Sequence, residues 1–334
     1  MKNNSKIRFA MLMTVLIVIT VLIAKENTGT EFFGQPYPGE EPVLFAPGVI
    51  SNALYVRDMA ITPDGTELYY TVMGNKLSKI IFSKKLNGKW TAPEVAPYSS
   101  NADYMDVEPH ITPDGNNLYF LSTRPLPGQD YKPGWQYQNI WAMDRQGSTW
   151  GEPYPLPAVI NNGDGVFFPS VTNDGTLYFS RQKTGTRSTL IYRSKRVNGA
   201  YSEPELLPKQ VNPTASQFNA CIAPDESYII FCSATIEGKI GLSDYYVCFR
   251  KKDDTWSEPI DLGNIVNKPG AQAVSPYISR DGKWFFFAST MSNSVKSPVT
   301  MKMLLAMNNE PQNGNSAIYW VSTKIIEKLR PVGF

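Results

Sequence analysis

Histidine, cysteine and charge are all scarce in this sequence. Its 334 residues contain one histidine, His110, and three cysteines. A single histidine excludes a histidine-rich metal site, and no Ser-His-Asp order surrounds it, so we expect His110 to pack structurally within a strand. Charged residues make up 19% of the chain and the formal net charge is +2. No large field of one sign is available to recruit nucleic acid, and that class of partner is excluded.

The three cysteines, Cys221, Cys232 and Cys248, fall within one short region. Their spacing matches no zinc-binding pattern. In an exported chain an odd number leaves at least one free thiol, and a cross-strand disulfide such as Cys232–Cys248 is one interpretation. The other is that all three are small buried hydrophobic side chains.

Long apolar runs are absent except at the N-terminus, where Lys2, Lys6 and Arg8 precede an uncharged run at residues 9–24. As a helix this run would rise about 24 Å, short of the roughly 30 Å hydrocarbon core of a bilayer. It is typical of a secretory signal or of a short signal-anchor, and both remain open. We expect export to the periplasm or the extracellular space, with an inner-membrane tether if the segment is retained.

A motif that occurs five times dominates the rest of the chain. Each copy has a short apolar strand, a turn resembling Pro-Asp-Gly, and a second strand rich in aromatic residues. The turn aspartates recur every 50 to 60 residues and are Asp64, Asp114, Asp174, Asp225 and Asp281. This period is that of a propeller blade, and a single blade cannot bury both faces of its sheet, so the repeats form one domain. The aspartates are dispersed, which indicates turn formation rather than calcium binding.

The second half of each copy predicts two further strands. A third strand is followed by a polar turn and by an aromatic residue and a proline, as in Trp150-Gly151-Glu152-Pro153. A proline is tolerated at the outer edge of a sheet, where its missing N–H breaks no ladder. Each blade should therefore contain four antiparallel strands, with the turn aspartate at the end of the innermost strand.

The fifth copy lacks a clear outer segment, whereas residues 39–44 form an orphan outer segment before the first copy. Pairing of the two would close a ring of five blades and remove its free edges. Six blades would require a degenerate repeat. We divide the chain into a signal peptide or signal-anchor (1–25), a linker (26–39) and a β-propeller (40–334).

The repeats resemble the WD40-like β-propeller (PD40) family, which includes the propeller of the periplasmic protein TolB. The residues that carry this resemblance are the turns and the strands after them, as in Pro113-Asp114-Gly115 with Leu118-Tyr119-Phe120, and the segment Asn139-Ile140-Trp141 with its Trp150-Gly151-Glu152-Pro153 ending. The resemblance covers roughly residues 40–331. It implies the fold but gives almost no information about function, because propellers of this kind serve in binding, in scaffolding and in catalysis.

Candidate site residues lie just before the apolar part of each inner strand. These five segments should converge on the mouth of the central channel. The aligned positions are Asp58, Glu108, Phe168, Asn219 and Ser275, with Asp106 close by. Two acids on adjacent blades could serve as general acid and base or hold a cation. Alternatively, the acids pair with Arg57 or with neighbouring backbone amides in a hydrated channel.

Two loop insertions should border the same face. Residues 124–137 include Arg124 and Trp135, and with Arg181 they would suit stacking on a sugar ring or contact with a peptide. Residues 292–315 contain an apolar, methionine-containing stretch. That stretch could be a short helix capping the channel or a partner surface, or it could pack in the core.

We predict an exported, non-enzymatic binding protein that uses the channel-mouth face, acts as a monomer, and takes an envelope protein, a glycan or a small ligand. No metal or cofactor is assigned. The alternative is a carbohydrate-active hydrolase or lyase with Asp58 and Glu108 as acid and base and Asp106 assisting. A third interpretation is a scaffold in an envelope complex, which differs from the first only in its partner.

Overall fold

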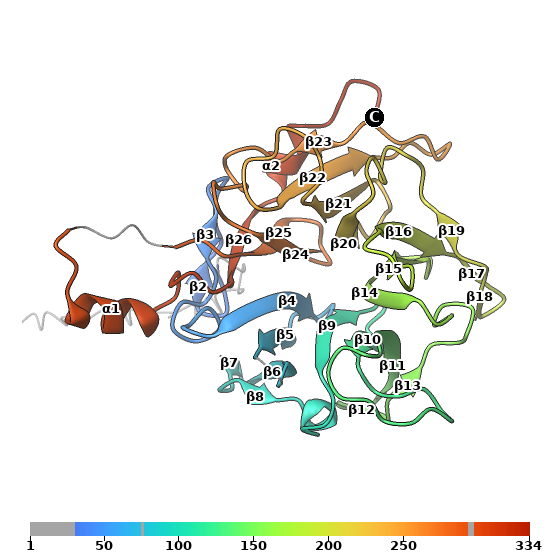
Figure 1. Cartoon of the computed structure of the whole chain (residues 1–334), viewed down its shortest axis with the longest axis horizontal. Coiled ribbons are helices and arrows are strands. Elements are labelled where there is room, and N and C mark those ends of the chain that lie inside the picture. The colour runs from blue at the N-terminus through green and yellow to red at the C-terminus, as the bar shows by residue number, and fades with distance from the viewer. Residues whose placement is uncertain (1–30, 75–76, 293–296) are drawn as a thin grey trace, which may run out of the picture.

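The computed structural model describes residues 31–74, 77–292 and 297–334 (Figure 1). The predicted signal or anchor segment, residues 1–25, lies outside this range. Within it, no helix is both long and apolar enough to cross a bilayer.

Five antiparallel sheets surround a central axis, as predicted (Figure 1). Blade 1 contains, from the axis outward, β4 (Tyr55–Ile61), β5 (Glu67–Met73), β6 (Lys79–Leu86) and β8 (Glu94–Val95). Blade 2 contains β9 (Asp106–Ile111), β10 (Asn117–Ser122), β11 (Asn139–Gln146) and β13 (Tyr154–Pro155). Blade 3 contains β14 (Gly165–Val171), β15 (Leu177–Gln182), β16 (Thr189–Ser194) and β19 (Glu205–Leu206). Blade 4 contains β20 (Gln217–Ile222), β21 (Tyr228–Ser233), β22 (Asp244–Phe249) and β23 (Ile260–Asp261).

Blade 5 is built from both ends of the domain and closes the ring. It contains β24 (Ala273–Ile278), β25 (Trp284–Ser289), β26 (Ala317–Ser322) and β3 (Val43–Leu44). In the β26–β3 pair Tyr319 lies opposite Leu44 and Trp320 opposite Val43. The predicted pairing of the N-terminal outer segment with the last blade is therefore confirmed, and the ring has five blades.

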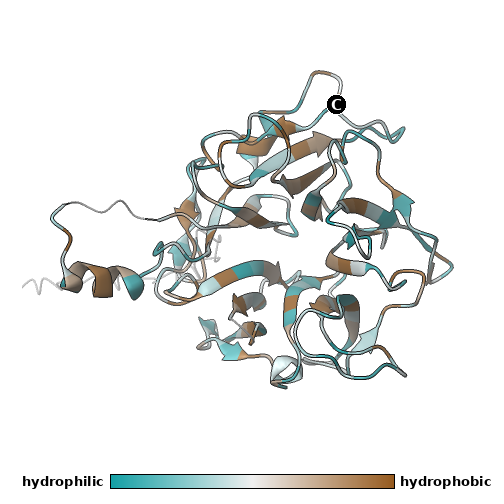
Figure 2. Cartoon of the chain, viewed as in Figure 1, coloured by the Kyte–Doolittle hydropathy of each residue, from teal (hydrophilic) through white to brown (hydrophobic). Residues whose placement is uncertain are grey.

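The hydrophobic core lies between neighbouring blades. One cluster, for example, joins Tyr69 and Ile80 of blade 1 to Leu118, Phe120 and Trp141 of blade 2. Flat aromatic rings suit this space because facing sheets leave a thin layer for side chains to fill. Brown, apolar segments accordingly recur along the strands of Figure 2. The aromatic second strand of each copy thus supplies the contact between blades.

The segment assigned to a linker, residues 26–39, is described from residue 31 onward. There β1 (Glu31–Phe32) and β2 (Gln35–Pro36) form a short hairpin. The ring of Phe32 lies 5.5 Å from that of Trp90 in blade 1 and 6.4 Å from that of Trp320 in blade 5. The hairpin therefore packs across the junction where the ring closes.

Short hairpins lie beyond the third strands of blades 1, 2 and 3. They involve β7 (Lys89–Trp90), β12 (Thr149–Trp150), and β17 (Arg196–Val197) with β18 (Ala200–Tyr201). The turn aspartates behave as predicted. In the first of them, Asp64 Oδ1 accepts hydrogen bonds from Thr62 Oγ1 at 2.6 Å and from the Thr66 N–H at 3.0 Å.

The apolar stretch in the second insertion forms helix α1 (Met301–Asn308). It projects away from the blades at the left of Figure 1, and none of its residues is buried. In Figure 2 part of its ribbon is brown, which marks apolar residues. The expectation of a helix is confirmed, while capping of the channel and packing in the core are both wrong. A second helix, α2 (Lys324–Glu327), follows β26.

Candidate functional site

A side-chain network fills the centre of the propeller. Arg57 Nε donates to Asp58 Oδ1 at 2.8 Å, and its Nη2 donates to Glu108 Oε1 at 3.1 Å and to Asn219 Oδ1 at 3.2 Å. Asn219 Nδ2 also donates to Glu108 Oε1, at 3.2 Å. One guanidinium therefore joins polar groups from blades 1, 2 and 4.

The remaining members of the network complete a ring of contacts between blades. The Phe168 N–H donates to Glu108 Oε2 at 2.7 Å, and the Glu108 N–H donates to Asp58 Oδ2 at 3.3 Å. Ser275 donates its hydroxyl to the Asp58 carboxylate. The five aligned positions predicted from the sequence are thus brought together, and every blade contributes one.

Each of these five residues lies at a bulge in its inner strand. Their φ angles are all positive, between 49° and 59°, and the register shifts at the same point of each strand. A left-handed conformation is costly for a residue with a side chain and persists only where its surroundings hold it. The bulges turn the five residues toward their neighbours, and the hydrogen bonds of the network hold them there.

The two acids of the network are buried and paired. Asp58 is 3% exposed and Glu108 is 6% exposed. Burial raises the pKa of Glu108 to about 7, although Arg57 beside it favours the charged form. The pKa of Arg57 is held above its ordinary value by Asp58 and Glu108, against the effect of burial. The arrangement is that of a structural ion network, matching the interpretation in which the acids pair with Arg57 and backbone amides.

Asp106 and Arg124 pair with each other at the start of blade 2, apart from this network. Arg124 Nη2 lies 3.1 Å from Asp106 Oδ2, and Nη1 also donates to that carboxylate. The guanidinium carbon is 5.3 Å from the ring centre of Tyr104 and 5.8 Å from that of Trp141. Burial raises the pKa of Asp106 in spite of Arg124.

Arg181 and Trp135 differ in their surroundings. The guanidinium carbon of Arg181 is 4.7 Å from the ring centre of Tyr192 and 5.3 Å from that of Phe179, so it stacks within blade 3. Trp135 is 40% exposed on the loop before β11. Among the described residues, no hydrogen bond or cation–π contact joins Arg124, Arg181 and Trp135 to one another.

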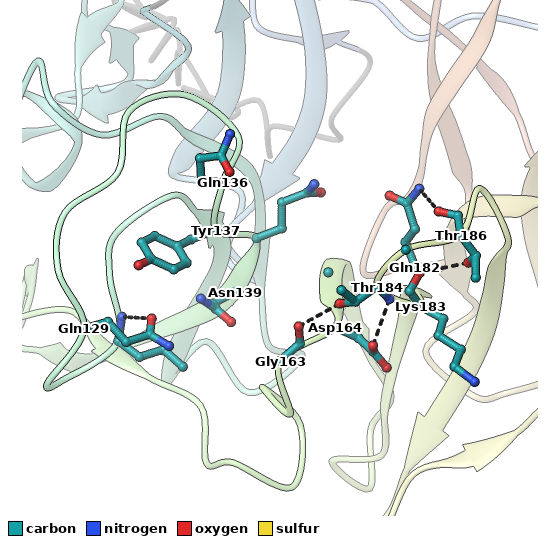
Figure 3. Close-up of a pocket in the computed structure, with 14 residues that line it drawn as sticks. Gln129, Gln136, Tyr137, Asn139, Gly163, Asp164, Gln182, Lys183, Thr184 and Thr186 are labelled. Atoms are coloured by element: carbon teal, nitrogen blue, oxygen red, sulfur yellow. Dashed lines mark hydrogen bonds between the residues drawn. The ribbon is translucent and has the colours of Figure 1, made fainter.

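A cavity of about 370 Å³ opens between the loop that precedes β11 and two loops of blade 3, at the end of the propeller opposite the Pro-Asp-Gly turns. Figure 3 shows Gln129, Tyr137 and Asn139 on one side, and Gln182, Lys183 and Thr184 on the other. Its full lining is Leu126, Gln129, Gln136, Tyr137, Gln138, Asn139, Gly163, Asp164, Gly165, Gln182, Lys183, Thr184, Gly185 and Thr186. We call it the inter-blade cavity.

Asn139, the first residue of β11, lines this cavity. It is 5% exposed, and its side chain makes no hydrogen bond to another residue in the described part of the chain. Of the equivalent residues, Lys79 Nζ donates to the carbonyl of Asn101, and Asp244 accepts from the Gly241 N–H at 2.8 Å. Thr189 of blade 3, like Asn139, makes no side-chain hydrogen bond among the described residues. The amide of Asn139 is not among the buried polar atoms that lack a partner, and it lines the open cavity, where a ligand could bind it.

Sequence reasoning placed residues 124–137 on the rim but missed this cavity. Its walls come from four separate stretches, around residues 126–129, 136–139, 163–165 and 182–186. The only signal in the sequence was their enrichment in amides and glycine. That signal is also typical of ordinary loops.

A second cavity and the arrangement of possible metal ligands also bear on what the protein could bind. A second cavity, of about 550 Å³, lies between blades 1 and 2 and is lined by aromatic residues that include Tyr69, Tyr98 and Trp150. Among the described residues, no group of three or more histidine, cysteine, aspartate or glutamate side chains could hold a metal ion.

His110 joins two blades on the side of the Pro-Asp-Gly turns. Its Nε2 accepts a hydrogen bond from the Val171 N–H at 2.9 Å, and burial lowers its pKa to about 4. The neutral ring therefore serves as an acceptor between β9 and β14, as expected for a histidine that packs in an inner strand.

Comparison with solved structures finds other β-propellers at low sequence identity. TolB from Acinetobacter baumannii is 16% identical, with a TM-score of 0.47, over 80% of this chain and 57% of that chain. A putative TolB from Agrobacterium tumefaciens is 14% identical, with a TM-score of 0.44, over 80% and 90%. An endo-arabinanase from Bacillus licheniformis is 12% identical, with a TM-score of 0.45, over 80% and 93%.

No family model matches the sequence, and neither does any curated protein. The present chain aligns with little more than half of the first TolB structure. The structural neighbours include both TolB-like propellers and enzymes, and at these identities the likeness concerns the fold alone.

Proposed function

We propose that this chain is an exported, non-enzymatic β-propeller of the PD40 type that binds a ligand in the inter-blade cavity. The observation that carries the proposal is this cavity of about 370 Å³, whose lining includes Gln136, Gln138 and Asn139, three amides that make no side-chain hydrogen bond to another described residue. These amides can bind a ligand without first giving up a contact within the protein.

The position of the cavity supports binding on the face predicted from the sequence. The cavity lies at the end of the propeller where the second strands give way to loops, and its walls include part of the insertion 124–137. The exposed indole of Trp135 belongs to the same insertion and could extend the contact surface. Loops positioned on a rigid scaffold are the usual place for binding residues.

The central network is the weaker candidate for the binding site. Asp58, Glu108, Asn219 and Ser275 hydrogen-bond to one another or to Arg57, and the N–H of Phe168 is taken by Glu108. A ligand would have to displace these contacts. For the same reason the alternative of a carbohydrate-active enzyme, with Asp58 and Glu108 as acid and base, gains no support from their geometry.

Location and partner form part of the proposal. The basic residues Lys2, Lys6 and Arg8 before the apolar run at 9–24 favour export, with the propeller on the outer side of the inner membrane. There the cavity would meet a small ligand, a glycan, or a loop of an envelope protein.

The test is a ligand screen on the purified full chain by thermal shift. Three proteins are compared: wild type, Asn139→Ala in the cavity, and Asn264→Ala, a matched substitution at an exposed asparagine of blade 4. The library contains neutral sugars, sugar acids, nucleotides, amino acids and short peptides. A ligand should raise the melting temperature of wild type and Asn264→Ala and lose that effect in Asn139→Ala. Ligands that stabilise all three proteins equally, or no ligand at all, would contradict the inter-blade site.

A further inference from the structure

We infer that the ligand of the inter-blade cavity is a neutral, hydroxyl-rich molecule of the size of one or two sugar rings. The inference rests on the proposed function and names the chemical class for that site. It follows from the hydrogen-bonding capacity, the charge and the apolar surface of the lining.

Primary amides dominate the polar lining. They are Gln129, Gln136, Gln138, Asn139 and Gln182. Two of them are partly committed: Gln129 Oε1 accepts from the Leu126 N–H at 3.1 Å, and Gln182 Nε2 donates to the Thr186 carbonyl at 3.2 Å. The other three make no side-chain hydrogen bond with the described residues.

An amide side chain carries two donors and an acceptor oxygen. A ligand that satisfies several of them at once must both donate and accept at closely spaced positions. Hydroxyl groups on neighbouring carbons do this, because each is a donor and an acceptor. Carboxylates and phosphates only accept, and ammonium groups only donate. The uncommitted Nδ2 and Oδ1 of Asn139 are therefore matched by a pair of adjacent hydroxyls.

The charge of the cavity argues in the same direction. Its lining contains one acid, Asp164, and one base, Lys183. Asp164 Oδ1 accepts from the Thr184 N–H at 3.0 Å, and Lys183 is exposed. The lining has no arginine to bind a phosphate or carboxylate through two hydrogen bonds. A neutral ligand fits this balance better than a charged one.

Apolar surface is small but well placed. Leu126 and the ring of Tyr137 are the apolar lining, and the Tyr137 hydroxyl donates to the Asp130 carbonyl at 2.8 Å, which fixes the ring. The C–H face of a sugar can lie against an aromatic ring while its hydroxyls reach the amides. A lipid or a steroid would find too little apolar surface. The volume of about 370 Å³ is at the small end of ligand sites, for which about 300–1,000 Å³ is usual.

The test is isothermal titration of the purified full chain with neutral mono- and disaccharides: glucose, galactose, arabinose, xylose, maltose and cellobiose. Glucuronate, glucose 6-phosphate and a mixture of free amino acids form the comparison set. At least one neutral sugar should bind. Asn139→Ala should weaken that binding by tenfold or more, Gln138→Ala by less, and the matched variant Asn264→Ala should not change it.

Folding of the variant is a built-in control, because Asn139 holds no described residue by its side chain. Asn139→Ala should therefore keep the melting temperature of wild type. If the ligands that depend on Asn139 are charged or peptidic and the neutral sugars do not bind, the inference is wrong and the proposed binding site stands. If neutral sugars bind and Asn139→Ala binds them equally, the site is elsewhere and both fail.

Discussion

The guanidinium of Arg57 lies 3.1 Å from the Glu108 carboxylate of the adjacent blade, and 2.8 Å from the carboxylate of Asp58 beside it in the chain. All three side chains are largely buried, with side-chain exposures of 14%, 6% and 1% in that order. One cation thus neutralises two acids that would otherwise repel each other near the axis.

Replacing Arg57 with an apolar residue should lower the free energy of unfolding by more than the loss of its hydrogen bonds alone. Arg57→Leu would leave two buried carboxylates unpaired, and the free energy of unfolding should fall by about 3–5 kcal/mol. Urea unfolding followed by circular dichroism measures the loss. The triple change Arg57→Leu, Asp58→Asn, Glu108→Gln removes the charges together and should recover most of the loss. Equal stability of Arg57→Leu and wild type would show that the network contributes little.

Closure of the ring should depend on Phe45, next to β3. Its ring is fully buried, 5.2 Å from the ring centres of both Phe286 and Trp320, and its N–H donates to the Ile318 carbonyl at 2.8 Å. Phe45→Ala should lower the free energy of unfolding by about 3–5 kcal/mol. Val49→Ala, at a nearby exposed position, should change it by less than about 0.5 kcal/mol. Similar losses in the two variants would argue against the β26–β3 closure.

The pH dependence of stability should carry a contribution from His110. Its pKa is lowered to about 4 by burial, against an ordinary value of 6.5. The folded state therefore binds a proton less readily than the unfolded state. The contribution of His110 to stability is complete above pH 6.5 and declines as the pH falls toward 4, by at most about 3 kcal/mol.

Glu108 titrates over an overlapping pH range and changes the stability of the protein in the opposite direction to His110. Its pKa is raised to about 7, so its burial lowers stability above pH 7, and this loss shrinks as the pH falls toward 4.5.

The measurement for His110 must therefore compare wild type with His110→Gln, whose side-chain oxygen can still accept from the Val171 N–H. The variant should lose less stability than wild type between pH 7 and pH 5. Parallel curves for the two proteins would contradict a neutral His110 in the folded protein.

The fold was largely predictable because the sequence contains a motif that is repeated in each blade. The turn aspartates and the aromatic second strands gave the number of blades, and the orphan segment at residues 39–44 gave the closure. Each of these is a local sequence pattern that indicates one type of structural element. The alignment of Asp58 with Glu108, Phe168, Asn219 and Ser275 likewise identified residues that meet at the axis, since equivalent positions in a propeller converge.

What those residues do at the axis did not follow from alignment. The positive φ angles at Asp58 and Glu108 turn their carboxylates toward neighbouring blades, and no sequence pattern states that turn. The inter-blade cavity was missed for a related reason. Asn139 begins β11, Asp164 lies in the loop before β14 and Gln182 ends β15, so their approach depends on the packing of two blades. Each stretch of sequence alone looks ordinary.

The three cysteines provide a test of the core of blade 4. All three are buried and free, and in the β21–β22 pair Cys232 lies opposite Tyr245 while Cys248 lies opposite Ile229. Because the two sulfurs do not share a register position, a disulfide between them is not formed. Burial raises the pKa of Cys221 to about 11 and that of Cys232 well above its ordinary value. A chromogenic thiol reagent at pH 8 should therefore find almost no reactive thiol in the native protein, and three after denaturation without reductant. One thiol after denaturation would instead indicate a disulfide, and a thiol that reacts at once in the native protein would show that blade 4 opens in solution.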